Sequence, residues 1–188
     1  MTPKLLFKER LSSGITELLF VVLTVLFLFL STWRGIVSGL DGWTVVLLCF
    51  FGFFLFYSLN YKWLRIRLTA EALSLRFGLF GWLIAARNID ACFPDDTSLW
   101  RIGGAGIHFT PLGGRYRAMF NFLEHPRLVI ALKVKKGPVR DIAFSTSRPD
   151  ELMFLIRDLI ARNRAAYQLA EADRGSAGST QDILDADS

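Results

Sequence analysis

Two long apolar segments near the beginning of the chain constrain its fold more than any other feature. The first, Ile15–Thr32, contains one charged residue, Glu17, and the second, Trp43–Tyr61, contains none. A helix rises 1.5 Å per residue, so about 18 residues cover about 27 Å, which is close to the hydrocarbon thickness of a bilayer. The two segments therefore predict a transmembrane helical hairpin over residues 14–61.

The charges that flank these segments predict the orientation of the hairpin. The connector between the segments holds Arg34 as its only positive charge, whereas the outer flanks hold Lys4, Lys8, Arg10, Lys62, Arg65 and Arg67. By the positive-inside rule, both termini face the cytoplasm and the connector faces out. The chain is therefore predicted to be integral to the plasma (inner) membrane, with residues 1–13 as a cytoplasmic N-terminal tail.

Beyond Tyr61 the pattern changes from continuous apolarity to alternation. In the run Leu64–Leu68, leucine and isoleucine alternate with arginine, as expected for a strand with one buried face. Similar short runs, separated by turns rich in Gly, Pro and Asp, recur as far as Phe144, with weaker strand character at Trp100–Ile102. They predict about seven short antiparallel strands.

A C-terminal helix is predicted to close this domain. Ser147 and Asp150 have the spacing of an S-x-x-D capping box, and Pro149 is tolerated in a first helical turn. Apolar residues then recur at the spacing of an amphipathic helix that packs on the sheet, namely Leu152, Leu155, Ile156, Leu159 and Ile160. The soluble domain is thus predicted over residues 62–167, followed by a disordered acidic tail over 168–188.

The overall charge favours a membrane rather than a nucleic acid as the acidic neighbour. The net charge is +5, but the basic residues are dispersed and accompany no nucleic-acid recognition motif. The lipid bilayer is therefore the expected partner, and no nucleic acid is expected. Cys49 and Cys92 fall in different parts of the chain, and no Cys/His cluster has metal-ligand spacing, so no metal or other cofactor is predicted.

Three further patterns could carry chemistry, and each has a simpler structural interpretation. The glycine-rich run Gly103–Gly106 leads into a strand-like run, whereas a phosphate loop opens a helix, so a turn is predicted. Asp95 and Asp96 follow a proline and are interpreted as an exposed turn rather than a carboxylate pair. His108 and His125 have no nucleophile or carboxylate that the sequence places beside them, so no catalytic residue is predicted.

Basic residues of the later strands form the one candidate binding surface. We call them the predicted patch, a possible contact for anionic headgroups or an acidic partner: Arg115, Arg117, Lys133, Lys135, Lys136 and Arg140.

The order of these elements resembles the bacterial PH-like (pleckstrin-homology-type) domains carried on small membrane proteins. The run Leu68–Gly78 resembles the opening hairpin of that family, and Ile84–Ile89 resembles its I-P-x-x-x-I run, with Ala85 where proline is common. Phe144–Thr146 with Pro149–Glu151 resembles the family's entry into its final helix. The resemblance covers residues 63–164. It implies an α+β fold, in which the transmembrane hairpin is followed by an antiparallel PH-like β-barrel or sandwich capped by one C-terminal helix.

The resemblance implies a membrane-anchored interaction or scaffolding module without catalytic activity, which binds a membrane or cytoplasmic protein. The alternative function is the sensing or handling of anionic lipids through the predicted patch. A third class, an enzyme, would require a membrane-proximal cleft with convergent titratable groups.

Overall fold

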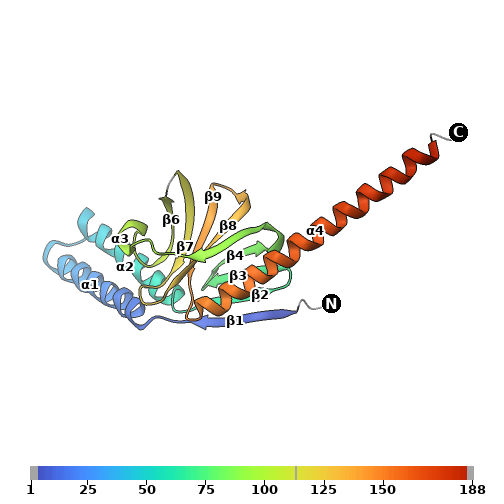
Figure 1. Cartoon of the computed structure of the whole chain (residues 1–188). Coiled ribbons are helices and arrows are strands. Elements are labelled where there is room, and N and C mark those ends of the chain that lie inside the picture. Colours follow the sequence, from blue (N-terminus) through green and yellow to red (C-terminus); the bar gives the residue numbers. More distant parts are fainter. Residues whose placement is uncertain (1–3, 113, 186–188) are drawn as a thin grey trace.

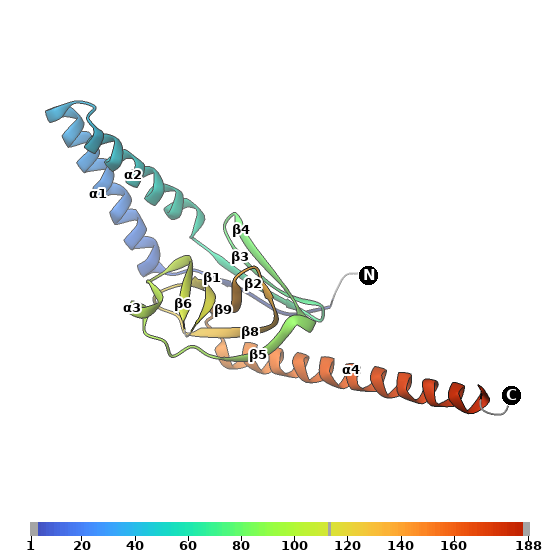
Figure 2. The ribbon, with the colours of Figure 1, turned by 90° about the horizontal axis from the view of Figure 1, so that it is seen from above.

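The computed structural model describes residues 4–112 and 114–185. Figure 1 shows a helical hairpin, α1 and α2, that projects from one end of a β body, and a long helix, α4, that leaves the body elsewhere. In Figure 2 the hairpin and α4 point away from the body in different directions. The α+β class is confirmed, with about nine strands in two sheets.

The two apolar segments are the helices α1 (Gly14–Ser38) and α2 (Gly42–Asn60). Each helix begins with a side-chain cap, since Ser13 accepts a hydrogen bond from the backbone N–H of Thr16 and Asp41 accepts one from that of Thr44. Only 17% of the apolar window of α1 and 6% of that of α2 are buried, whereas a core helix of a soluble protein is mostly buried. The pair is compatible with a two-span membrane protein.

The first sheet contains four antiparallel strands in the order β1 (Leu5–Leu11), β2 (Leu64–Thr69), β3 (Ala72–Phe77) and β4 (Phe80–Ala85). The β2–β3 hairpin is the one that the alternation predicts. Residues 5–11, which are expected to belong to a separate tail, instead form β1 and pair with β2 from Leu5 opposite Thr69 to Leu11 opposite Leu64. The β domain therefore includes chain from both sides of the helical hairpin.

The second sheet has the order β5-β8-β9-β7-β6. Its strands are β5 (Ile89–Pro94), β6 (Gly106–Leu112), β7 (Arg115–Asn121), β8 (Arg127–Lys136) and β9 (Val139–Ser145). The prediction of antiparallel strands is wrong for β7 and β9, which are neighbours and run parallel, because β8 follows β7 in the chain but pairs with β9 on its other side. In the described residues neither sheet closes on itself, so the predicted barrel is not confirmed.

Two short helical segments connect these strands. The 3-10 turn η1 (Ala86–Asn88) leads from the first sheet to the second. The short helix α3 (Leu99–Ile102) occupies the segment in which weak strand character is expected, and glycines with positive φ follow it at Gly103 and Gly104. The glycine run is therefore a turn that leads into β6, as predicted.

The core lies between the inner faces of the two sheets and the first turns of α4. The alternation buries the side chains of Leu64, Ile66 and Leu68 completely. Burial of one such side chain stabilises the folded state by about 1.5–3 kcal/mol relative to the same side chain in water. Other fully buried members of the core from the two sheets are Leu73, Leu75, Phe77, Leu128, Ile130, Ile142 and Phe144.

The helix α4 (Pro149–Asp185) covers the core with the predicted apolar stripe. Its buried residues are Leu152, Ile156, Leu159 and Ile160, and Leu155 is partly buried. Pro149 is the first helical residue, and the Ser147 hydroxyl donates to Glu9 instead of closing a capping box. Residues 168–185 of the segment predicted as a disordered tail belong to α4, and residues 186–188 lie outside the described part of the chain.

Candidate functional site

The junction between the helical hairpin and the first sheet positions the candidate site. The strand β1 leads into α1, and α2 leads into β2. Since Leu11 is paired with Leu64, the sheet holds the two ends of the hairpin side by side (Figure 1). A residue near the start of β2 or the end of β1 is therefore close to the base of both helices.

The loop between β7 and β8 holds the start of α1. The carboxylate of Glu124 accepts hydrogen bonds from the Ser13 hydroxyl at 2.8 Å and from the backbone N–H of Ile15 at 2.5 Å. The hydrogen bonds from Ser13 and Ile15 lower the pKa of Glu124 below its usual range. His125, which the sequence analysis leaves without a partner, contacts the carbonyl oxygen of Ser12 through Nε2 at 3.1 Å.

The end of α2 is held by the β3–β4 turn. The rings of Tyr57 and Tyr61 stack at 4.4 Å, and Phe80 lies 6.2 Å from Tyr61 between ring centroids. Gly78 approaches the backbone of α2 so closely that a Cβ there would lie 2.1 Å from the carbonyl oxygen of Asn60. The turn is thus packed against the point where α2 leaves the β domain.

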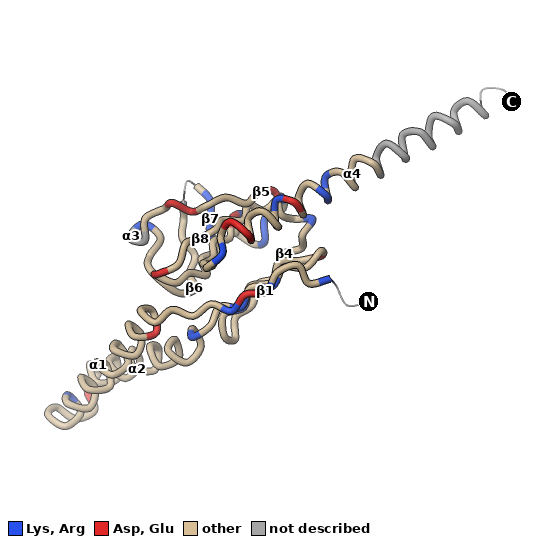
Figure 3. The backbone as a smooth tube through the Cα atoms, turned by 60° about the horizontal axis from the view of Figure 1, so that its bottom comes forward, with Lys and Arg blue, Asp and Glu red and all other residues tan. Residues whose placement is uncertain are grey.

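Five basic residues share the outer face of the first sheet. Because Leu64, Ile66 and Leu68 face the core, the intervening positions face out. In register, Arg10 pairs with Arg65 and Arg65 with Arg76, and Lys8 pairs with Arg67 in the next row. All five are exposed, and we call them the basic sheet face: Lys8, Arg10, Arg65, Arg67 and Arg76. Figure 3 shows basic positions of β1 and its neighbours beside the base of α1 and α2.

Aromatic and ionic contacts join the basic sheet face to the helices. The guanidinium carbon of Arg10 lies 3.9 Å from the centroid of a Trp63 ring. The Nζ atom of Lys62 lies 3.0 Å from a carboxylate oxygen of Glu17, in the first turn of α1. Trp63 lies one residue before β2, where the chain passes from α2 into the first sheet.

The residues of the predicted patch lie in three kinds of surroundings. Arg115, Lys135 and Arg140 are exposed, and Lys136 lies with Nζ 5.2 Å from the ring centroid of Trp82. Lys133 instead lines a groove beside α4. Arg117 is mostly enclosed and forms ion pairs within the domain, so it is not available to a partner in this arrangement.

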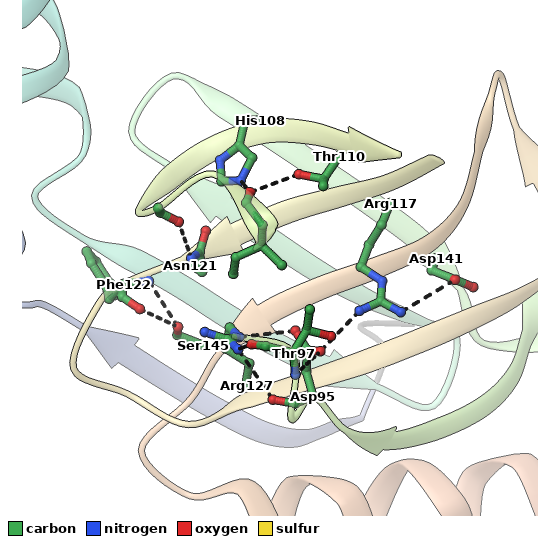
Figure 4. A network of polar contacts seen from close by, with 12 residues as sticks. Asp95, Thr97, His108, Thr110, Arg117, Asn121, Phe122, Arg127, Asp141 and Ser145 are labelled. Carbon is green, nitrogen blue, oxygen red and sulfur yellow. Dashed lines mark hydrogen bonds and ion pairs between the residues drawn. The ribbon is translucent and has the colours of Figure 1, made fainter. Parts of the chain in front are cut away.

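A largely buried ionic network accounts for Arg117 (Figure 4). Asp95 lies 3.1 Å from both Arg117 and Arg127, and Arg117 also lies 3.8 Å from Asp141. Burial alone would raise the pKa of Asp95, but the hydrogen bonds from Thr97 and the two guanidinium groups outweigh it and lower the pKa. The exposed-turn interpretation is therefore wrong for Asp95, which holds the segment after β5 against β7 and β8.

The two histidines form no catalytic pair in this structure. His108 contacts the carbonyl oxygen of Ile102, which also accepts a hydrogen bond from Thr110 at 2.9 Å (Figure 4). Burial lowers the pKa of His108, which favours the neutral ring. In the described part of the chain, no group of three or more His, Cys, Asp or Glu side chains could hold a metal ion.

A groove of about 790 Å³ lies between η1, β8 and α4. Val134 and Tyr167 are among the residues that line it, and the cationic residues at it are Arg87, Lys133 and Arg164. The backbone of Val134 is paired with the Asn88 amide by two hydrogen bonds, at 2.8 and 3.0 Å. The groove thus combines apolar surface with positive charge on the side of the domain that carries α4.

Comparison with protein-family models, with curated proteins and with solved structures finds no match to this chain. The site must therefore be interpreted from its own residues. The sequence patterns give Lys8 and Arg10 only as flanking charges and Arg65 and Arg67 also as outward residues of a strand, and they do not show that these four share one surface with Arg76. The alternation of Arg65, Arg67 and Arg76 with apolar residues in two separate runs is a signal for part of this surface.

Proposed function

We propose that this chain is a two-span membrane-anchored interaction module without catalytic activity, whose PH-like β domain lies on an anionic membrane surface. The observation that carries the proposal is the basic sheet face at the base of the helical hairpin. On this proposal, both termini and the β domain are cytoplasmic, where anionic lipids attract juxtamembrane basic residues.

The repulsion between basic residues that face each other on neighbouring strands supports a polyanionic neighbour. Like charges directly opposite each other on neighbouring strands are destabilising, and Arg65 has an arginine opposite it on both sides. The ion pairs of the described residues include none of the basic sheet face. An anionic leaflet would neutralise these charges, and its attraction contributes about 1 kcal/mol of binding free energy for each Lys or Arg near the surface.

Hydrogen exchange of the full chain in nanodiscs tests this proposal. We expect the amides of β2 and β3 to exchange more slowly in nanodiscs that contain phosphatidylglycerol than in those of phosphatidylcholine alone, and the difference to shrink at high salt. The double variant Arg65→Glu with Arg67→Glu should abolish the difference. The variant Lys135→Glu with Arg140→Glu, which changes the predicted patch by the same charge, should retain it. Loss of the difference only in the second variant would contradict the proposal.

A second candidate function is the binding of a protein segment in the groove beside α4. Its apolar surface and the cations Arg87 and Lys133 favour a segment with apolar and acidic residues, whereas Arg164 already lies 3.4 Å from Asp90 in an ion pair. A photoreactive residue at Val134 should form a discrete adduct with an acidic segment, and Arg87→Glu should remove it. The same residue at Phe154, on the exposed side of α4, serves as the control. Identical adducts from both positions would contradict this function.

A further inference from the structure

A small pocket lies where α2 ends and the basic sheet face begins. It encloses about 280 Å³ and is lined by Leu59, Asn60, Lys62, Trp63, Arg65, Arg76 and Gly78. These residues come from the end of α2, the segment that leads from it into β2, and the end of β3 with the turn that follows it. The pocket therefore belongs to the junction that connects the helices to the sheet.

The pocket carries three cations against one nearby carboxylate. Arg65 and Arg76 are opposite each other on β2 and β3, where paired residues have Cβ atoms about 4.5–5.5 Å apart. The Nε of Arg76 donates to the carbonyl oxygen of Gly78 at 3.4 Å, which directs this side chain toward the turn. Lys62 contacts Glu17 at 3.0 Å, so the two guanidinium groups hold the uncompensated charge.

Two guanidinium groups side by side match the oxygens of a phosphate group. Each presents its N–H donors in a planar fork that can bind two oxygens at once, and an ammonium group adds a point charge. A phosphate monoester exposes more anionic oxygens than the phosphodiester of phosphatidylglycerol. The pocket therefore favours a terminal phosphate over a bridging one.

The position of the pocket favours a lipid as the source of that phosphate. Arg65 lines the same pocket as Leu59 and Asn60, the last residues of α2, so its side chain lies beside the helix end. The headgroup layer begins at the end of a spanning helix and is about 5–8 Å thick, and a long arginine side chain can extend back into it. Leu59, which is 72% exposed at the pocket, offers an apolar surface on the membrane side.

We propose that this pocket binds the phosphate monoester headgroup of a membrane lipid, with Arg65 and Arg76 as its principal ligands and Lys62 as a third. The inference rests on the proposed membrane contact of the basic sheet face, and it adds that the pocket selects one class of lipid. Arg67 lies on the same face but outside the pocket, and its substitution provides the control for general charge on that face.

Lipid binding to the full chain in a neutral detergent micelle tests this inference. Native mass spectrometry would compare phosphatidic acid with phosphatidylglycerol as probes. We expect phosphatidic acid to bind at least about tenfold more tightly, and Arg65→Gln with Arg76→Gln to remove that preference, whereas Arg67→Gln should retain it. All three side chains are exposed, and near-ultraviolet circular dichroism would show that each variant remains folded.

Three results would overturn the inference. One is equal binding of the two lipids to the unsubstituted chain. Another is a loss of binding in Arg67→Gln that is at least about half of the loss in the pocket variant, as expected for diffuse charge because Arg67→Gln removes one positive charge and the pocket variant removes two. The third is displacement of phosphatidic acid by millimolar inorganic phosphate, which would assign the pocket to a soluble phosphate. The two proposals can fail separately. If β2 still exchanges slowly in phosphatidylglycerol nanodiscs but the chain binds both lipids equally, the selective pocket is contradicted and the proposed function is not.

Discussion

Replacing Glu9 with alanine removes the carboxylate that joins β1 to the start of α4. Glu9 is 7% exposed and points inward from β1. Its carboxylate accepts hydrogen bonds from the Thr146 hydroxyl at 2.5 Å, from the backbone N–H of Ser147 at 2.9 Å and from the Ser147 hydroxyl. The substitution therefore tests whether the N-terminal strand is an integral part of the β domain.

The expected loss of stability follows from which donors remain buried. Thr146 is fully buried, so its hydroxyl would lose its acceptor at a cost of about 1–3 kcal/mol. Ser147 is exposed, so water can replace its lost partner. We expect Glu9→Ala to lower the free energy of unfolding by about 2–3 kcal/mol. Glu9→Gln keeps one acceptor oxygen and should lower it by about 1 kcal/mol.

Urea unfolding of the full chain in detergent micelles, followed by near-ultraviolet circular dichroism, measures these differences. Lys8→Ala is the matched control, because Lys8 is the neighbouring residue on the exposed face of the same strand. A double-mutant cycle of Glu9→Ala with Thr146→Val should give a coupling energy of about 1 kcal/mol or more. If Glu9→Ala unfolds like Lys8→Ala and the coupling energy is zero, the role assigned to this contact is wrong.

Four other measurements test separate parts of the structure. Asp95→Asn leaves two largely buried guanidinium groups without their shared carboxylate and should lower the free energy of unfolding by about 3 kcal/mol in the same urea titration. Asp96→Asn, at an exposed position, should change it by less than about 0.5 kcal/mol. The pKa of Asp95 is lower in the folded chain than its unfolded value of about 3.9. The ionised carboxylate therefore stabilises the fold fully above that unfolded value, and this stabilisation is lost as the pH falls through the folded pKa. Asp95→Asn should accordingly make the free energy of unfolding less dependent on pH in that acid range. Gly78→Ala should cost at least about 2 kcal/mol more than Gly137→Ala, since both have positive φ but only the former places a Cβ against backbone; equal thermal shifts would contradict the close approach to α2. Burial raises the pKa of the Cys92 thiol to about 12, so a water-soluble maleimide should label it only after unfolding, and rapid labelling of the folded chain would show that the thiol is accessible.

Local patterns were sufficient to predict the elements whose partners are close in sequence. Length and apolarity predicted α1 and α2, and alternation around a tight turn predicted the β2–β3 hairpin. The apolar spacing after Pro149 predicted the buried stripe of α4. In each case the signal depends on a property of the segment itself.

Features that depend on distant partners were not predictable in this way. The strand β1 was missed because Glu9 interrupts its alternation, and the partners that satisfy Glu9 lie at the start of α4. Arg117 was assigned to a binding surface because its ion partner Asp95 precedes it by 22 residues. The full basic sheet face was missed for the same reason, since Lys8 and Arg10 join the arginines of β2 and β3 only once β1 pairs with β2.

The contact between the basic sheet face and an anionic membrane can be measured most directly with a nitroxide label at Ser74. This residue pairs with Arg67 in the middle of that face. In a full chain whose two cysteines are replaced by alanine, the accessibility of the label to a water-soluble nickel chelate would be compared between nanodiscs of phosphatidylcholine and nanodiscs that contain phosphatidylglycerol. We expect phosphatidylglycerol to lower the accessibility at Ser74 and to leave that of a label at Phe154 unchanged. Equal accessibility at Ser74 in both kinds of nanodisc would contradict the proposed membrane contact.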